Sequence, residues 1–388
     1  MSVLREERRR PPWALLLACL LLASGLLAPA SEARGRRAPP GFYGATWDRG
    51  VARSSDGDQD RQWGVMARTG VESARAMFSW ATAQPGAGDP FDFERTDRLV
   101  ALAARHRIRL LPLVEQAPVW ARRRPSRFGS PPKRFGDYAA YLTALVRRYG
   151  PRGTFWDENP QLRRRPLREW QIWNEPHLQF YWDVGRRSPD RWPMGYVRLL
   201  KVSRAAIKSA DRRASVVAAG LTNESWRHLG TLYRRHAGRL FDVVAVQTYT
   251  SSPLNLLRAY RKVRTVMRRH QDRRKRLWAT ELGWPASRGR TRARPAERSF
   301  VTTDLTMARR LKTIYAYLVK RRRNPRYRVS RAYWYTWASS YRPGDIFDYS
   351  GLLRFDGMRF HERPAVRYYR SSAIRYEGCV KTTAGACR

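Results

Sequence analysis

The sequence predicts a single α/β domain folded as a (β/α)8 TIM barrel, and two observations carry this prediction. Eight short apolar runs rich in β-branched and aromatic residues recur along the chain, several of them without the strict alternation of a half-exposed strand. Amphipathic stretches with a helical period separate these runs, and no low-complexity or Gly/Ser-rich linker divides the chain. Strands and helices that alternate in this number indicate a barrel of about 340 residues.

The expected elements follow one another in a regular order. The strands are Gly41–Trp47, Val71–Trp80, Ile108–Val114, Trp170–Trp173, Ser215–Ala219, Phe241–Tyr249, Arg276–Glu281 and Val329–Trp337. The helical period is clearest over residues 135–149, 196–210 and 305–318, where apolar side chains recur three or four positions apart. Each of these helices therefore has one face that can pack on the strands.

The chain of 388 residues is strongly basic. It has 77 Lys and Arg residues against 32 Asp and Glu, which gives a formal net charge of +45, and its 43% hydrophobic content excludes a wholly disordered protein. Basic residues gather at 122–134 and 288–298, in the loops expected after the third and seventh strands, where they would favour an anionic glycan. Residues 258–274, on the outer wall, are equally basic, so general surface charge is the simpler interpretation. No nucleic-acid-binding motif accompanies the charge.

Residues 1–33 have the features of a secretory signal peptide, which leaves residues 34–388 as the barrel domain. Four arginines precede an apolar stretch of about 16 residues, shorter than the roughly 20 of a membrane-spanning helix, and small residues that suit cleavage follow. The sequence predicts secretion after cleavage, and an uncleaved N-terminal membrane anchor is the alternative. No other segment predicts a membrane span.

Cys379 and Cys387 are the only cysteines after the signal. An exported protein meets an oxidising compartment, so the sequence predicts that they form a short disulfide loop; two free thiols are the alternative. Neither cysteine has metal-ligating neighbours. We therefore expect neither a metal nor a cofactor.

Polar and aromatic residues end the eight expected strands, and these ends meet at one mouth of a barrel. They are Trp47-Asp48, Ser79-Trp80, Glu115-Gln116, Asn174-Glu175, Thr222-Asn223, Tyr249, Glu281 and Trp337. Glu175 and Glu281 end the fourth and seventh strands, which face each other across the mouth. A single Glu at a strand end is usually a cap or an ion-pair partner. Two carboxyl groups across a mouth are what glycoside hydrolysis requires, one as an acid and one as a base or nucleophile.

These two strand ends resemble the active-site motifs of retaining glycoside hydrolases of clan A, with families 39 and 5 as the nearest. Trp173-Asn174-Glu175-Pro176 is similar to their acid/base motif, and Glu281-Leu282-Gly283-Trp284 is similar to their nucleophile motif. The similarity covers about residues 41–375. It implies a cofactor-free enzyme acting on carbohydrate, with Glu175 as general acid/base and Glu281 as nucleophile. We expect the protein to be a monomer.

The resemblance also implies roles for other residues. Asn174 would bind the sugar 2-hydroxyl, Tyr249 would hold Glu281, and Arg75 would support the negative charge of Glu281. The alternative for Tyr249 is a packed strand aromatic, and the alternative for Arg75 is a salt bridge lower in the barrel. Trp337 would form a platform for the sugar, with a non-proline cis peptide following it.

Four further residues complete the expected site. Trp80 and Trp284 would stack on sugar rings, and His177 would line the cleft unless it only packs there. Gln247 stands two residues before Tyr249, where relatives commonly have His, so the sugar contacts at this position differ from theirs.

Two rival classes of function remain open from the sequence. One is a non-catalytic glycan-binding protein on a barrel scaffold, and the other is a basic cell-envelope adhesin that binds through charge alone. Turnover of an activated aryl β-glycoside separates both of them from an enzyme.

Overall fold

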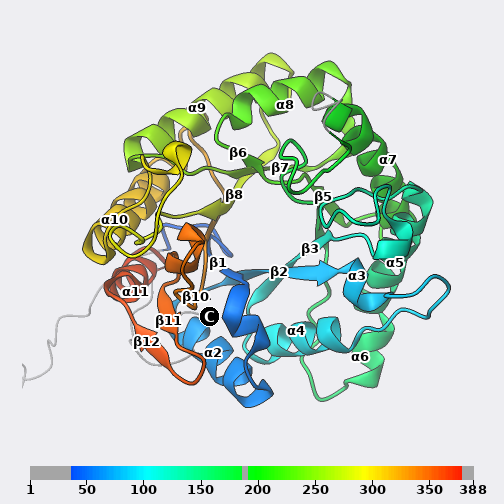
Figure 1. Cartoon of the computed structure of the whole chain (residues 1–388), viewed down its shortest axis with the longest axis horizontal. Coiled ribbons are helices and arrows are strands. Elements are labelled where there is room, and N and C mark those ends of the chain that lie inside the picture. Colours follow the sequence, from blue (N-terminus) through cyan, green and yellow to red (C-terminus); the bar gives the residue numbers. More distant parts are fainter. Residues whose placement is uncertain (1–35, 186–190, 378–388) are drawn as a thin grey trace, which may run out of the picture.

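The computed structural model describes residues 36–185 and 191–377, in which a closed barrel of parallel strands is surrounded by helices (Figure 1). Its strands are β1 (Tyr43–Trp47), β2 (Ser73–Ser79), β3 (Arg109–Glu115), β4 (Glu169–Ile172), β5 (Ser215–Val217), β7 (Val243–Gln247), β8 (Arg276–Leu282) and β9 (Arg331–Trp334). They pair in the order β5-β4-β3-β2-β1-β9-β8-β7, and a pairing between β5 and β7 closes the barrel. The seventh barrel strand in chain order is therefore β8.

A long helix follows each barrel strand and covers the outside of the barrel. These helices are α2 (Asp56–Thr69), α4 (Glu94–Arg105), α5 (Phe135–Tyr149), α7 (Trp192–Ala210), α8 (Ser225–Arg234), α9 (Pro253–Arg269), α10 (Asp304–Lys320) and α11 (Pro364–Glu377). Two short helices, α3 (Trp80–Ala83) and α6 (Thr154–Glu158), lie in the connections. Each predicted strand range overlaps one observed strand, so the predicted (β/α)8 TIM barrel is confirmed.

The inside of the barrel has an apolar layer and a polar layer. The apolar layer is a buried cluster drawn from five strands, namely Leu111, Val217, Val243, Ala245, Trp278 and Tyr333. The polar layer consists of further inward-facing side chains, namely Arg75, Gln171, Gln247 and Thr280, all of them buried. Buried polar groups are stable only when they are hydrogen-bonded, so this second layer is a rigid polar floor beneath the barrel mouth.

The fifth barrel strand is interrupted, which the sequence did not predict. The ladder of β5 stops at Val217 and resumes as the two-residue strand β6 (Leu221–Thr222), which pairs with β7. Between them, a Cβ atom at Gly220 would lie 2.3 Å from the side chain of Gln247. Only glycine leaves room there for this buried amide of the polar floor.

The last barrel strand ends earlier than predicted, at Trp334 rather than at Trp337. The chain then forms a small separate sheet from β10 (Ala338–Ser339), β11 (Leu353–Phe355) and β12 (Phe360–Glu362), in which β10 and β11 are parallel and β12 is antiparallel. This sheet lies beside the barrel mouth, before α11.

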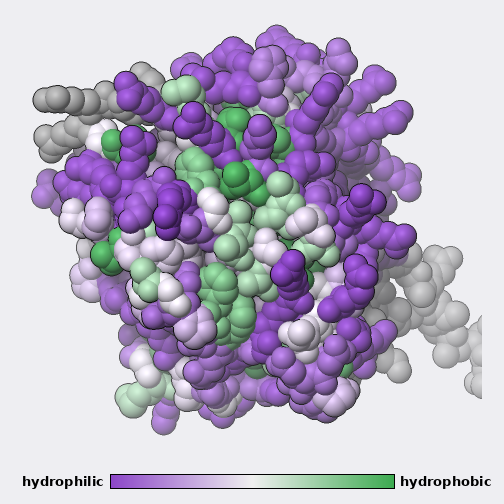
Figure 2. Space-filling view, turned by 90° about the vertical axis from the view of Figure 1, so that its right-hand side faces the viewer, coloured by the Kyte–Doolittle hydropathy of each residue, from purple (hydrophilic) through white to green (hydrophobic). Residues whose placement is uncertain are grey.

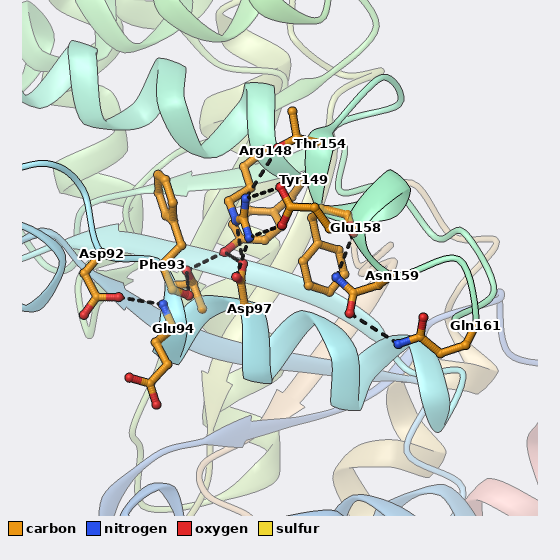
Figure 3. A network of polar contacts seen from close by, with 12 residues as sticks. Asp92, Phe93, Glu94, Asp97, Arg148, Tyr149, Thr154, Glu158, Asn159 and Gln161 are labelled. Carbon is orange, nitrogen blue, oxygen red and sulfur yellow. Dashed lines mark hydrogen bonds and ion pairs between the residues drawn. The ribbon is translucent and has the colours of Figure 1, made fainter.

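An ion-pair network joins three outer helices (Figure 3). Arg148 on α5 donates to Asp97 on α4, with Nε 2.6 Å from Oδ1, and to Glu158 on α6, with Nη2 2.8 Å from Oε2. The Tyr149 hydroxyl also donates to Asp97, at 2.6 Å. The network fixes α4, α5 and α6 against one another.

The surface agrees with the high net charge. Figure 2 shows the side of the molecule that carries α5 and α7, where hydrophilic side chains cover most of the periphery and more apolar residues form a band across the middle. Some large apolar side chains remain exposed, including Phe128 at 52% and Phe180 at 66% of their surface.

Some predictions fall outside the described residues. The signal peptide at 1–33 and the disulfide between Cys379 and Cys387 both lie there, so they stay predictions. Across residues 36–185 and 191–377, none of the helices combines the length and the apolar character needed to cross a bilayer.

Candidate active site

An open cavity of about 630 Å³ lies at the mouth formed by the carboxyl ends of the strands. This is the end of a (β/α)8 barrel where active sites are found. Its walls come from seven strands or the turns that follow them: Thr46, Trp47, Asp48, Arg75, Ala76, Met77, Leu113, Glu115, Asn174, Glu175, Tyr181, Tyr249, Glu281, Tyr335 and Phe347. The structure therefore brings Glu175 and Glu281 into one cavity, together with Arg75, Asn174 and Tyr249.

The strand β8 has an irregularity at Glu281, whose side chain lines the cavity. The ladder between β7 and β8 shifts register there, because Val246 pairs with Ala279 while the next residue, Gln247, pairs with Glu281. Trp278 and Thr280 point into the barrel, so strict alternation would turn Glu281 outward. A shift of this kind, as at a β-bulge, re-aims a side chain beside an active site.

Three donors hold the carboxylate of Glu281. Arg75 Nη1 lies 2.7 Å from Oε1, Gln247 Nε2 lies 3.0 Å from the same oxygen, and the Tyr249 hydroxyl lies 2.7 Å from Oε2. Burial raises the pKa of Glu281, while the Arg75 guanidinium and the hydrogen bond from Tyr249 oppose that rise. These contacts favour the ionised carboxylate, as a nucleophile requires.

Arg75 organises the polar floor below the two carboxyl groups. Besides Glu281, its guanidinium donates to Gln171 Oε1 at 2.6 Å and to Asn174 Oδ1 at 2.9 Å. Gln247 Nε2 also donates to Asn174 Oδ1, at 2.8 Å. Since both bonds go to the oxygen of Asn174, its Nδ2 donors are left for a ligand. Gln247 is fully buried and contacts other site residues instead of lining the cavity.

Glu175 has the opposite environment. Its carboxyl group makes no hydrogen bond within the described residues, and burial together with the charge of Glu281 raises its pKa well above the ordinary value, with Arg75 opposing. It therefore remains protonated where Glu281 is ionised. The backbone here is unusual as well, with φ of 65° at Trp173 and 39° at Glu175. Left-handed conformations at non-glycine residues are costly and concentrate at functional sites.

We expect Arg75→Met to change the pH dependence of catalysis, an effect that a loss of packing alone would not produce. Loss of the cation raises the pKa of Glu281, so the acidic limb of the profile of kcat/KM against pH moves to higher pH and the rate falls about 10²- to 10³-fold. Arg331→Met is the matched control, because Arg331 is also buried and pairs with a carboxylate, Glu169, at the other end of the barrel. Both variants lose on the order of 3–5 kcal/mol of stability. An unmoved acidic limb in Arg75→Met would contradict the role of Arg75.

The three tryptophans expected to contact sugar do not line the cavity. Trp80, Trp284 and Trp337 are completely buried, and each indole is engaged within the protein. Trp80 Nε1 donates to Gln84 Oε1 at 3.0 Å. Trp284 Nε1 donates to the Thr250 carbonyl at 2.6 Å, and Trp337 Nε1 donates to Gln62 Oε1 at 3.0 Å. They pack between the barrel and its helices. The prediction of Trp337 as a platform is therefore corrected.

Tyr335 takes the place in the cavity that the sequence predicts for Trp337. It lines the cavity, its hydroxyl donates to Asp48 Oδ2 at 3.0 Å, and the non-proline cis peptide follows it, between Tyr335 and Thr336. The alternation of side chains along β9 could have predicted this position. Tyr333 points into the barrel, and Tyr335, two positions further on, lies on the same side. Tyr181 and Phe347 also line the cavity. The sequence did not predict either of them, because Tyr181 lies in a turn and Phe347 in a short 3-10 helix (Ile346–Tyr349), both outside the predicted strand ends.

His177 packs beside the site without lining it. Its Nε2 lies 2.6 Å from Thr222 Oγ1, and its ring stacks on that of His228, with centroids 4.1 Å apart. Burial and the nearby His228 lower the pKa of His177 to about 3, so it is neutral at ordinary pH. Throughout the described part of the chain, no set of three or more His, Cys, Asp or Glu side chains is arranged to hold a metal ion.

Solved structures share this fold, whereas no family model and no curated protein matches the chain. A family 39 glycoside hydrolase from the gut symbiont Bacteroides cellulosilyticus matches with a TM-score of 0.64 at 18% identity, over 87% of this chain and 64% of that one, which is less than two thirds of its length. A GH39 β-xylosidase from Caulobacter crescentus matches with a TM-score of 0.58 at 18% identity, over 87% of this chain and 72% of that one. A GH5_18 protein from Streptomyces cattleya in complex with Manb1-4GlcNAc matches with a TM-score of 0.64 at 17% identity, over 89% of this chain and 82% of that one. At these identities the likeness establishes the (β/α)8 fold that the sequence predicts.

Proposed function

We propose that this protein is a secreted retaining glycoside hydrolase that cleaves β-linked oligo- or polysaccharides by double displacement. One observation carries the proposal: two buried carboxyl groups share the cavity at the barrel mouth in opposite environments. Among the described residues, three donors hold Glu281, whereas none contacts the carboxyl group of Glu175, and the pKa of Glu175 is raised. A pair of carboxyl groups whose pKa values are pushed apart suits an acid and a nucleophile. The glycoside hydrolases that share the fold support the same interpretation.

In the first step, the Glu281 carboxylate attacks the anomeric carbon while Glu175 gives its proton to the departing glycosidic oxygen. The glycosidic bond breaks, and an ester forms between the sugar and Glu281. In the second step, Glu175 takes a proton from a water molecule, which attacks the same carbon and releases Glu281. Two displacements at one carbon retain the anomeric configuration. The free Nδ2 donors of Asn174 suit a hydrogen bond to a sugar hydroxyl in both steps.

The charge of Glu281 explains how Glu175 changes roles between the two steps. In the free site this charge raises the pKa of Glu175 and keeps it protonated as an acid. Formation of the ester removes the charge, so the pKa of Glu175 falls and its carboxylate becomes available as a base. Arg75 and Tyr249 remain in place to receive Glu281 when it leaves.

The surroundings of the cavity suit a substrate of more than one sugar. A second hollow of about 770 Å³ adjoins the cavity between the ends of β1 and β2 and the helices α2 and α4, and the two share Trp47, Asp48, Ala76 and Met77 as walls. The rings of Phe128 and Phe180 are exposed and lie 6.1 Å apart, and Phe180 directly precedes the cavity residue Tyr181 along the chain. Exposed aromatic rings provide faces on which sugars can stack.

A panel of 4-nitrophenyl α- and β-glycosides tests the proposal. We expect hydrolysis of at least one β-glycoside, with the β-anomer as the first product in NMR spectra. Binding of glycans without turnover of any member would favour a non-catalytic glycan-binding protein instead. Binding to cell envelopes that salt abolishes, again without turnover, would favour the adhesin.

We expect the basic loops to matter only for charged polymers. Several of their arginines are paired, such as Arg124 with Asp183 and Arg290 with Asp304, while Arg292 and Arg298 are exposed. Exposed charges act through a screening length of roughly 8–10 Å. Hydrolysis of a small neutral glycoside should therefore vary little with ionic strength, whereas an anionic polymer should lose rate as salt rises. Equal rates on acidic and neutral polymers at low salt would show that the arginines are only surface charge.

A further inference from the structure

The cavity contains more carboxyl groups than the proposed reaction uses. Asp48, which follows β1, and Glu115, at the end of β3, line it in addition to the catalytic pair. Among the described lining residues Arg75 is the one cation, and its guanidinium already pairs with Glu281 at 2.7 Å. The cavity is therefore acidic, although the surface around it is strongly basic.

Glu115 is the unusual member of this group. It is only 7% exposed, faces the cavity, and its carboxyl group makes no hydrogen bond or ion pair within the described residues. Burial raises the pKa of Glu115 to about 8, against the opposing effect of Arg75 and with added contributions from Asp48 and Glu281. At neutral pH this carboxyl group is therefore largely protonated in the free protein. A buried polar group without a partner is costly, which indicates that a bound ligand supplies the missing hydrogen-bond partner.

The chemistry of the cavity narrows the class of this ligand. A sugar carboxylate would be repelled by the negative charges of Asp48 and Glu281. A metal ion is disfavoured, because these groups and the others in the described chain are not arranged as a metal site. A neutral hydroxyl group would satisfy a hydrogen bond to Glu115 but would not stabilise its carboxylate form. An ammonium group does both, since it donates hydrogen bonds and its positive charge lowers the pKa of Glu115, so that the carboxylate forms when the ligand binds.

We propose that the sugar bound in this cavity carries a protonated amino group, held by Glu115 with Asp48 adding negative charge beside it. The inference rests on the proposed glycosidase function and names the substrate class of the same site, an amino sugar with its nitrogen unacetylated. N-acetylation removes the charge and adds bulk, so the amide should be a poor substitute. The basic outer surface would repel a polymer with an amine on every residue, so single glycosides and short oligosaccharides are the better probes.

Kinetics on matched glycosides test the inference with the whole enzyme. Each neutral 4-nitrophenyl β-glycoside is compared with its amino-deoxy counterparts at C2, C3, C4 and C6, and with the N-acetyl form of each. We expect kcat/KM for one amino-deoxy compound to exceed that of its hydroxyl parent by about 10- to 100-fold, the range of a charge-assisted hydrogen bond. Glu115→Gln keeps the shape and removes the charge, and it should bring this ratio toward one. Glu224→Gln, an exposed carboxyl group on the outside, should keep the wild-type ratio.

The outcomes distinguish this inference from the function on which it rests. Hydrolysis of neutral glycosides with no preference for any amine would overturn the amino-sugar inference and leave the glycosidase intact. No hydrolysis of any member would refute the glycosidase. The wild-type preference is measured without a variant, so the inference stays testable if Glu115→Gln fails to fold. An amine preference that survives in a folded Glu115→Gln would overturn the role of Glu115.

Discussion

Glu281→Ala should reduce turnover of the best aryl β-glycoside by at least about 10⁴-fold, because the variant lacks the group that forms the covalent bond. The loss should occur in kcat and in kcat/KM alike. Sodium azide should restore turnover, because the truncated side chain leaves space for a small anion at the anomeric carbon. The rescued product should be the α-glycosyl azide, since a single displacement inverts the configuration.

Glu224→Ala is the matched control for this variant. Glu224 is an exposed carboxyl group that precedes α8 and pairs with its neighbour Arg227, so the control should keep wild-type activity and the same melting temperature within a few degrees. Near wild-type activity in a folded Glu281→Ala, measured on a verified substrate, would show that Glu281 is not the nucleophile.

Glu175→Ala should have an effect that depends on the leaving group. Phenols of low pKa depart without a proton, so formation of the glycosyl-enzyme on their glycosides should slow little, whereas alkyl glycosides and oligosaccharides should lose on the order of 10²- to 10⁴-fold. The basic limb of the pH profile should also disappear, because Glu175 is the group that must be protonated in the first step.

Azide distinguishes the two glutamates. In Glu175→Ala the ester on Glu281 still forms, so azide should attack it and give a glycosyl azide of retained configuration. A uniform loss over good and poor leaving groups would contradict the assignment of Glu175 as the acid.

Much of this site was predictable because parallel strands buried on both faces appear in the sequence as apolar runs with polar ends. The two runs that end in Glu175 and Glu281 place both carboxyl groups at one mouth, and the structure confirms that placement. Arg75 and Tyr249 were each open to two interpretations from the sequence. The contacts to Glu281 at 2.7 Å place both of them in the site.

The remainder depended on local geometry that the sequence pattern does not reveal. The end of β9 is three residues earlier than the apolar run indicates, so Tyr335 lines the cavity and Trp337 is turned into the packing. The register shift in β8 changes which side of the strand faces inward, and the break at Gly220 depends on contact with Gln247. Glu115 stood among the predicted strand ends, but the absence of a partner becomes apparent only in three dimensions.

The central claim is that Glu281 becomes covalently bound to the sugar while Glu175 does not. A 2-deoxy-2-fluoro glycosyl fluoride of the preferred sugar tests it directly. The fluorine at C2 slows both formation and hydrolysis of the ester, and the good fluoride leaving group restores the rate of formation alone, so the ester accumulates. Peptide mapping by mass spectrometry should find one fluorosugar per protein, attached to Glu281. A label on Glu175 or Glu115, or an inverted product with no label, would contradict the account.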